Sequence, residues 1–256
     1  MAARGQDWGL PLGNQILGVA APALNGLIDK DRMVDRIVFT STAAGASTPM
    51  TGVVTALTVG GQNLLQSDAP TGFPIEMIAS VADDDGAFIG CPIKGGLSVA
   101  CNATLDAAAD TSAIAFTSIL PEGVSPVPDE DDYNFIFPMG DVVVAPGAAF
   151  TLTATARRNV TLGRLVMVAV SGAGAYAADG TVVNSILVAG AEILSGAGSI
   201  SFVGAPSDNI NPLGPTANDS DGLRIDLAIE AGETVTITGT SVSGCNVRGG
   251  IYLEEA

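Results

Sequence analysis

The stretch Val182-Val183-Asn184-Ser185-Ile186-Leu187-Val188-Ala189-Gly190-Ala191-Glu192-Ile193-Leu194 decides the fold of this chain because its pattern occurs twice. The stretch Val53-Val54-Thr55-Ala56-Leu57-Thr58-Val59-Gly60-Gly61-Gln62-Asn63-Leu64-Leu65 lies 129 residues earlier. Identical residues stand at Val53 and Val182, Val54 and Val183, Val59 and Val188, Gly61 and Gly190, and Leu65 and Leu194. Each copy predicts an apolar strand that runs into a turn of small residues.

The sequences that flank the two copies also match in order. Upstream, Arg36-Ile37-Val38-Phe39 matches Arg164-Leu165-Val166-Met167, and Val19–Pro22 resembles Val144–Gly147. Downstream, the matches are Gly96–Val99 with Gly222–Ile225, Leu105-Asp106-Ala107 with Ile229-Glu230-Ala231, and Asp110-Thr111 with Glu233-Thr234. Because the offset drifts by only a few residues, we predict two copies of one unit. Equivalent core positions are then expected for Val53 with Val182 and Val59 with Val188, and equivalent turns for Gly61 with Gly190.

The fold class that we predict is all-β, with two tandem antiparallel β-sandwich or jelly-roll units related by internal duplication. About eight short strands per unit, separated by turn residues, are typical of such folds. We expect an irregular N-terminal segment over residues 1–14, a first unit over 15–120, a linker over 121–138 and a second unit over 139–256. The linker combines several prolines with a run of acidic residues.

The secondary structure of some single segments is less clear from the sequence than the overall architecture. Residues 24–38 roughly fit a helical stripe of apolar side chains, but their counterpart Phe150–Ala156 alternates apolar residues with threonine. We therefore expect strands here too, including Met33–Ser41. A further strand is expected over Ile75–Val81, and a long surface loop over Ala205–Asp221.

Composition narrows the possible partners. The 256 residues include 10 Lys and Arg against 27 Asp and Glu, so the formal net charge is −17. This balance argues against direct binding of nucleic acid, which needs clustered basic residues. Hydrophobic residues make up 47% of the chain and charged residues only 14%. Such a chain fits a large buried area or an extensive interface with partners.

The sequence offers little catalytic chemistry. It contains no histidine, which excludes Ser-His-Asp and Cys-His catalysis and histidine metal sites. It also has no glycine-rich phosphate loop followed by lysine. We therefore predict that the protein is not an enzyme and has no catalytic or cofactor-binding residues. Cys91, Cys101 and Cys245 are expected to be buried free thiols, with a Cys91–Cys101 disulfide as the alternative.

Acidic clusters supply the one candidate for a metal site. Asp83-Asp84-Asp85 and Asp129–Asp132 are expected to be solvated tips, because neither has the spacing of a calcium loop. The segment Asp219-Ser220-Asp221-Gly222 is closer to a calcium-binding turn. Asp219 and Asp221 are therefore the candidate Ca²⁺ ligands, with a solvated loop as the alternative.

Tandem β-units, scarce catalytic residues and the pattern Phe150-Thr151-Leu152-Thr153, Arg164–Met167 and Ile186–Gly190 resemble the double jelly-roll major capsid proteins of tailless icosahedral viruses and bacteriophages. In that family, trimers form a pseudo-hexagonal tile over an internal membrane. The resemblance implies a structural protein of the virion capsid that assembles with itself, as a homotrimer within a larger shell. Other capsid proteins and an internal membrane are the further partners that it implies.

Two other functions fit the same composition. One is a secreted or cell-surface tandem β-sandwich that serves as an adhesion or appendage subunit. The other is a lectin-like carbohydrate-binding jelly roll, although aromatic residues, which form the usual platforms for sugars, make up only 5% of the chain.

Overall fold

A computed structural model of the chain describes residues 8–19, 21–42, 51–69, 71–78, 87–106, 109–127, 135–171, 181–194, 199–202 and 223–254. Nearly all of its elements are β-strands, and the short 3₁₀ helix η1 (Ile75–Met77) is the single helix in these ranges. Within them, no helix is long and apolar enough to cross a membrane. The prediction of an all-β chain is confirmed.

The first unit is a sandwich of two antiparallel sheets. One sheet has the strand order β1 (Trp8–Val19), β9 (Ala109–Ile119), β3 (Arg32–Thr42) and β7 (Ala87–Ile93). The other has the order β2 (Ala23–Leu27), β8 (Ser98–Leu105), β4 (Gly52–Val59) and β5 (Gln62–Asn63), and β6 (Phe73–Pro74) also pairs with β4.

The second unit repeats this arrangement strand for strand. Its first sheet has the order β10 (Ile136–Val144), β18 (Cys245–Glu254), β12 (Val160–Val170) and β16 (Leu223–Ile229). Its second sheet has the order β11 (Ala149–Thr155), β17 (Thr234–Ser241), β13 (Thr181–Val188) and β14 (Ala191–Glu192), with β15 (Ile200–Phe202) on β13.

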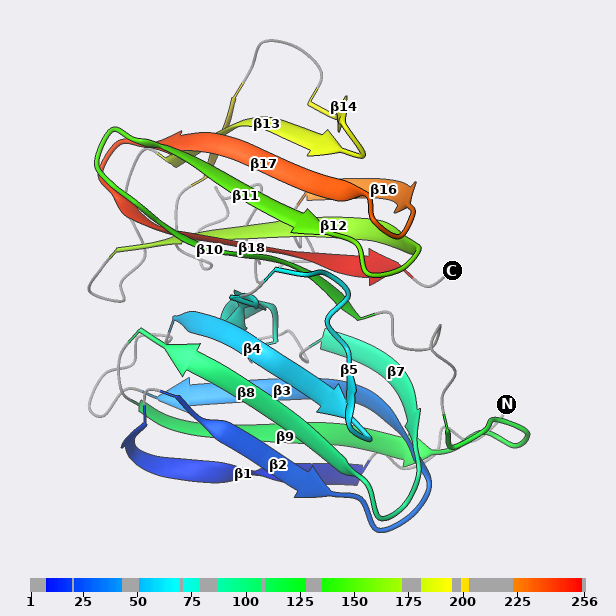
Figure 1. The fold of residues 1–256 in the computed structure, drawn as a ribbon. Helices are drawn as coiled ribbons and strands as arrows, with labels where there is room; N and C mark the ends of the chain where they lie inside the picture. Colours follow the sequence, from blue (N-terminus) through cyan, green and yellow to red (C-terminus); the bar gives the residue numbers. More distant parts are fainter. Residues whose placement is uncertain are drawn as a thin grey trace.

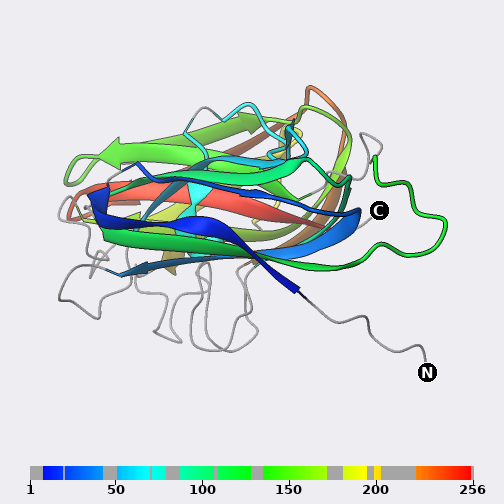
Figure 2. The same cartoon turned by 90° about the horizontal axis from the view of Figure 1, so that it is seen from below.

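The strand order identifies both units as jelly rolls. In each unit the first strand pairs with the last, and the second strand pairs with the last but one. Antiparallel strands wound into two sheets in this way form a jelly roll. The two jelly rolls lie side by side, with β4 and β13 running in one direction and β8 and β17 in the other (Figure 1). Seen from below, the strands of both units again run along the same axis (Figure 2).

The repeated stretch forms the same hairpin in both units. In the first unit the turn residues Gly60 and Gly61 have φ of 61° and 85°, and in the second Ala189 and Gly190 have φ of 49° and 80°. Two consecutive residues with positive φ fit the right-handed twist of a two-residue hairpin. After each turn a side chain accepts a backbone hydrogen bond, from Leu65 N to Asn63 Oδ1 at 3.1 Å and from Leu194 N to Glu192 Oε1 at 3.0 Å.

Most of the equivalences predicted for this stretch are confirmed. Val59 and Val188 are both buried at corresponding positions of β4 and β13. Val53 and Val182 also correspond, but Val53 is buried whereas Val182 is half-exposed. Two further features recur at matching positions: a bulge after Val54 and after Val183, and a bulge at Pro11–Gly13 and at Pro138–Gly140.

The downstream half of the predicted repeat is wrong. Ser98 begins β8, whereas Leu223 begins β16, and the counterpart of β8 is β17. The correct match pairs the turn at Gly96, with φ of 86°, with the turn at Gly232, with φ of 89°. The error arose because apolar pairs that follow a glycine recur throughout this chain, so the short downstream matches were not specific.

Three other local expectations need correction. β1 begins at Trp8, so Trp8–Asn14 is strand rather than irregular. Ile75–Met77 is a 3₁₀ turn rather than part of a strand. β10 begins at Ile136, inside the segment 121–138 that we expected to be a linker. The strand predicted over Met33–Ser41 is confirmed, because β3 spans Arg32–Thr42.

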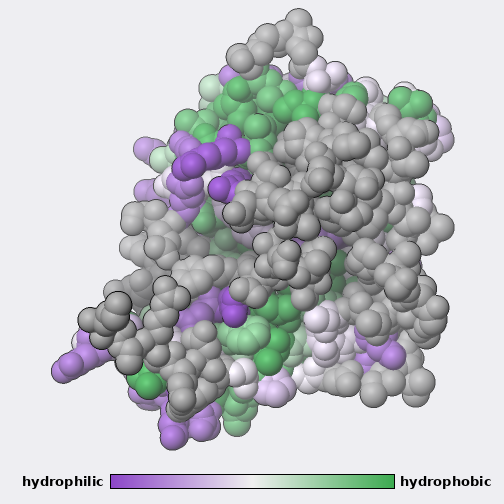
Figure 3. Space-filling view, turned by 180° about the vertical axis from the view of Figure 1, so that it is seen from behind, coloured by the Kyte–Doolittle hydropathy of each residue, from purple (hydrophilic) through white to green (hydrophobic). Residues whose placement is uncertain are grey.

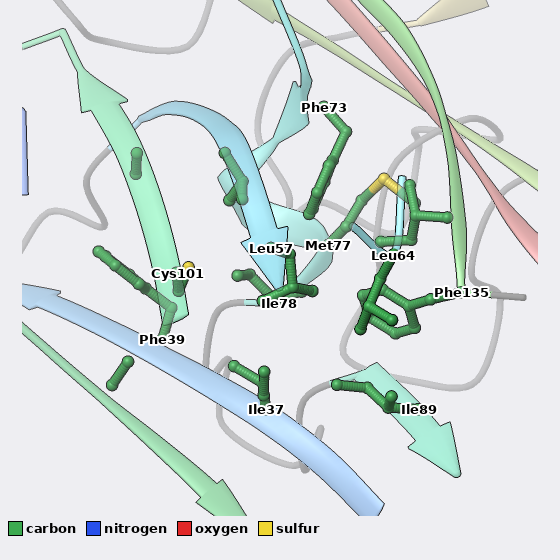
Figure 4. Close-up of a cluster of buried hydrophobic side chains, with 14 of the residues drawn as sticks. Ile37, Phe39, Leu57, Leu64, Phe73, Met77, Ile78, Ile89, Cys101 and Phe135 are labelled. Atoms are coloured by element: carbon green, nitrogen blue, oxygen red, sulfur yellow. The ribbon is translucent and has the colours of Figure 1, made fainter. Parts of the chain in front are cut away.

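Each jelly roll has its own core, but the core of the first unit extends into the second. Between the sheets of the first unit lie side chains such as Ile37, Phe39 and Leu57 (Figure 4). The same cluster includes Phe135, Ile136, Val166, Val168 and Val170 from the second unit. The alternate residues of β12, among them Leu165 and Met167, point into the second core. One strand therefore contributes to both cores.

Candidate functional site

The contact between the two jelly rolls is the place where functional side chains of the described residues converge. Its apolar part consists of the valines of β12 that pack into the first core. Around them, Leu65 forms a parallel bridge with Ile136, and the Tyr252 hydroxyl donates a hydrogen bond to the carbonyl oxygen of Met77 at 2.7 Å. A close approach is possible because Gly250 lacks a side chain: a Cβ there would lie 2.5 Å from Met77 Sδ.

A buried ion pair lies at one side of this contact. Arg248 on β18 is only 2% exposed, and its Nη1 and Nη2 atoms donate to the two carboxylate oxygens of Asp106 at 2.7 and 2.5 Å. Asp106 follows β8 of the first unit, so this bidentate pair joins the two jelly rolls. The hydroxyl of Thr51 donates a further hydrogen bond to Asp106 at 2.5 Å. Asp141 on β10 lies 3.5 Å from Arg248 Nε.

The two aspartates respond differently to this environment. Burial raises the pKa of Asp106, but hydrogen bonds from Arg248 and Thr51 and the charge of Arg248 outweigh it, so the pKa lies below its ordinary value. Burial also raises the pKa of Asp141, and the nearby charge of Asp106 adds to it, so the pKa lies above its ordinary value despite Arg248. The pKa of Arg248 is raised by Asp106, Asp141 and Glu76 despite the opposing effect of burial. Arg248 is therefore a fixed cation among several carboxylates.

This cluster has the chemistry of a structural joint. A planar guanidinium matches a carboxylate in two parallel hydrogen bonds, which fixes orientation as well as distance. Replacing such a pair by apolar residues is often neutral, whereas removal of one partner leaves a buried charge without compensation. The ion pair between Arg248 and Asp106 thus fixes the position of the end of β8 against β18. This arrangement is structural, because neither side chain is directed at an open cavity as a nucleophile or as an acid or base.

A groove lies elsewhere, at the end of the second unit. It has a volume of about 510 Å³ and is lined by Asn159, Val160, Thr161, Ala189, Ala228, Ile229, Glu230 and Glu233. Two of its polar side chains already bind backbone: Asn159 Oδ1 accepts from Ala231 N at 2.9 Å, and Glu233 Oε2 accepts from Glu230 N at 2.7 Å. These residues stabilise the loop between β16 and β17 and leave no converging set of groups for a ligand.

The residues predicted as metal ligands, Asp219 and Asp221, lie outside the described residues, as do Asp83–Asp85, Asp129–Asp132 and the loop 205–221. In the ranges that are described, no three His, Cys, Asp or Glu side chains are grouped to hold a metal ion. Calcium binding at Asp219 and Asp221 stays a prediction.

The prediction for the cysteines is confirmed. Cys91, Cys101 and Cys245 are free and buried, so the alternative of a Cys91–Cys101 disulfide is wrong. Burial raises the pKa of the Cys101 thiol to about 12. A thiol with such a pKa is inert at neutral pH, because the thiolate is the reactive form.

The sequence did not point to Arg248, Asp106 or Asp141. A signal was present, since Arg248 lies in the interior of a strand whose other charged residue is the last one, Glu254, in a chain with only 10 basic residues. Its partner could not be identified, because Asp106 is 142 residues away in the sequence and lies in the other unit.

No protein-family model matches the sequence, and no curated protein sequence is significantly similar to it. Among solved structures, the major capsid protein P2 from bacteriophage PM2 is similar, with 11% identity, a TM-score of 0.44, and coverage of 97% of this chain and 98% of that one. The atomic structure of Sulfolobus Turreted Icosahedral Virus gives 11% identity, a TM-score of 0.22, and coverage of 100% and 96%. At these scores neither similarity supports an inference about this chain, whose fold follows from its own strand order.

Proposed function

We propose that the protein is a self-assembling structural protein, a viral major capsid protein that tiles an icosahedral shell. The observation that carries this proposal is the arrangement of two jelly rolls with the same strand order, side by side and in the same direction, in one chain (Figure 1). Jelly rolls serve as viral capsid domains, lectins and cupins. Cupin chemistry needs histidines, and this chain has none.

The finer proposal is a homotrimer. Three such chains bring together six nearly equivalent jelly rolls, which form a tile with six similar edges. Closed rings of this kind arise when a head-to-tail contact repeats through a rotation that closes. The tile would contact other capsid proteins and an internal membrane. The net charge of −17 argues against direct contact with nucleic acid, and the proposed role is not enzymatic.

The two alternative functions have less support. An appendage subunit that borrows a strand from a neighbour would have a gap in its sheet, whereas each unit here supplies all nine strands of its own two sheets. A lectin would present aromatic rings to the sugar, but the large hydrophobic side chains that are exposed in the described ranges are all Leu, Ile or Val.

The proposal is tested by electron microscopy and mass measurement of the purified full-length protein. We expect trimers that associate into closed shells with pseudo-hexagonal tiles. Filaments, or a monomer at all concentrations, would contradict the proposal.

Salt dependence supplies a second test of assembly. Acidic surfaces repel one another unless salt or bound cations screen them, so assembly should weaken at low ionic strength or with a calcium chelator. A particle that is equally stable under both treatments would show that neither screening nor bridging cations contributes.

A further inference from the structure

A pocket opens beside the turn that joins β2 to β3 in the first unit. It has a volume of about 340 Å³, and its apolar walls include Leu10 and Ile28. The charged and hydroxyl side chains that line it are Asp29, Lys30, Arg32 and Thr117. Small-molecule sites are concave, have volumes of roughly 300–1,000 Å³, and combine apolar walls with a few converging polar groups. The pocket matches this description.

Two of the polar side chains in this pocket are buried. Arg32 on β3 is 6% exposed and Thr117 on β9 is 4% exposed, whereas Lys30 is exposed at the rim. Arginine is almost never buried this far unless it is paired, and Arg32 does have an interaction within the chain. A guanidinium carries five N–H donors in a fixed fork, so it can contact a neighbour and a ligand at the same time.

The duplicated unit allows these positions to be compared with their counterparts. Arg36 on β3 pairs with Phe116 on β9, and Arg164 on β12 pairs with Tyr252 on β18. Both arginines directly follow a bulge at the same place in their strands. This register aligns β3 and β9 of the first unit with β12 and β18 of the second.

The counterparts of the buried polar residues are apolar. By this register, Val160 stands in the place of Arg32, and Leu253 stands in the place of Thr117. Val160 is buried in the core of the second unit, and Leu253 packs against that core. The same strand arrangement is thus built with apolar residues at both positions. The jelly roll therefore needs neither a guanidinium nor a hydroxyl there.

The turn that carries Lys30 is fixed against the turn between β7 and β8. Gly96 N donates a hydrogen bond to Ile28 O at 2.8 Å, and Gly95 N donates to Asp31 Oδ1 at 2.8 Å. A Cβ on Gly95 would lie 2.9 Å from Lys30 Cα, so glycine is what lets the two turns approach this closely. Because the turn is already ordered, less entropy is lost when a ligand binds to it.

We propose that this pocket binds a phosphate group through the guanidinium of Arg32, the ammonium of Lys30 and the hydroxyl of Thr117. A phosphate group has several strong acceptor oxygens, which suits donors that come from β3, from the β2–β3 turn and from β9. Arginine pairs with phosphate through two parallel hydrogen bonds, and lysine binds it as a point charge. The two cations outnumber the one carboxylate in the lining, that of Asp29. The inference goes beyond the proposed function, because assembly does not require such a site.

The phosphate group has two sources, the free ion and the headgroup of an anionic lipid. Asp29 and Lys30 are exposed, so the pocket is open to solvent. The surface of the first unit is not uniformly polar, since Figure 3 shows hydrophilic patches beside hydrophobic ones in the lower part of the view. Titration with inorganic phosphate tests the free ion, and flotation with phosphatidylcholine vesicles, with and without phosphatidylglycerol, tests the headgroup.

Two substitutions in the full-length protein test the site by isothermal titration calorimetry with inorganic phosphate at constant ionic strength. Arg32→Val introduces the residue type that Val160 has in the second unit, so the fold should tolerate it. It should weaken phosphate binding by about 10-fold or more, because hydrogen bonds to charged groups are the strong ones. Lys30→Met should weaken binding by roughly 2- to 5-fold, since an exposed charge contributes less.

A matched control separates the pocket from general effects of charge. Lys94 is the other lysine of the chain. It is exposed on the neighbouring turn between β7 and β8 and does not line the pocket. Lys94→Met therefore removes the same charge as Lys30→Met and should leave phosphate binding unchanged. Circular dichroism should show the same β-structure in every variant.

The outcomes decide both the site and the source of its phosphate. Phosphate binding without retention on vesicles assigns the site to the free ion, whereas retention on anionic vesicles that free phosphate reverses assigns it to a headgroup. Absence of both kinds of binding, or an equal loss in Lys94→Met and Lys30→Met, would overturn the proposal. If Arg32→Val does not fold, unchanged binding in both Lys30→Met and Thr117→Val would overturn it as well. Assembly is measured separately, so the capsid proposal can stand when this one fails.

Discussion

Substitution of Arg248 by methionine is the sharpest test of the joint between the two jelly rolls. Methionine keeps an unbranched apolar stem of similar length but removes the two hydrogen bonds of 2.7 and 2.5 Å to Asp106 and the charge 3.5 Å from Asp141. Loss of one partner from a buried ion pair costs about 3–5 kcal/mol. In a chain of this size, 1 kcal/mol changes Tm by about 2–4 °C, so we expect Tm to fall by roughly 10 °C at neutral pH.

The pH dependence gives this prediction its signature. In the native protein the lowered pKa of Asp106 means that its contribution is present above the unfolded-state value of about 3.9 and is lost as pH falls through the lower folded value. Without Arg248, burial and Asp141 would instead hold the pKa of Asp106 above its ordinary value, so the variant should gain stability as pH falls. The difference in Tm between the two proteins should therefore shrink from pH of about 7 to about 4.

Differential scanning calorimetry at the two pH values measures this difference. Arg224→Met is the control, because Arg224 is 64% exposed and its ion pairs should contribute less than about 1 kcal/mol. The variant Arg248→Met with Asp106→Leu should lose less stability than Arg248→Met alone, since it removes the unpaired carboxylate. A loss no larger than that of Arg224→Met, or one that is independent of pH, would refute the role given to this pair.

Three further predictions concern single residues. Asp141→Asn should stabilise the protein by about 1 kcal/mol or less at neutral pH, because the raised pKa of Asp141 indicates that its charged form is disfavoured in the fold. The gain in Tm should disappear as pH falls below about 3.9. A loss of stability at neutral pH would contradict this account of Asp141. Ala189→Gly should stabilise by about 0.5–1 kcal/mol and Gly60→Ala should destabilise by a similar amount, because both positions have positive φ; urea denaturation midpoints that move in the same direction would count against this account. Cys101 should react with a thiol reagent only after denaturation, since burial raises its pKa to about 12; rapid labelling of Cys101 in the native protein would show that it is accessible.

The parts of the fold that the sequence could predict are those with a local signal. The hairpins at Gly61 and Gly190 depend on neighbouring residues with positive φ and on a strand of valines, so their repetition was visible. The downstream match of Gly222–Ile225 failed because short apolar stretches after a glycine carry no information about which strand pairs with which. Strand order is decided by contacts between residues far apart in the sequence, and these have no local pattern.

The candidate site was hidden for the same reason. Asp219 and Asp221 were proposed from their spacing, which is a local feature, and they lie outside the described residues. Arg248 and Asp106 come from different units, and only the packing of one jelly roll against the other brings them together. A duplicated sequence indicates that two similar units exist, but not which faces they turn to one another.

The core shared by the two jelly rolls has a consequence for biosynthesis. The strands of the first unit are complete at Ile119, but its core also takes in Val166, Val168 and Val170. At an elongation rate of about 5–20 residues per second, the ribosome takes roughly 3–10 s to add the intervening residues. During that time the nascent first jelly roll displays the apolar surface that Val166, Val168 and Val170 cover in the folded chain. Its folding is therefore timed by the appearance of β12, and a pause in translation between these points would lengthen the period in which nascent chains can aggregate.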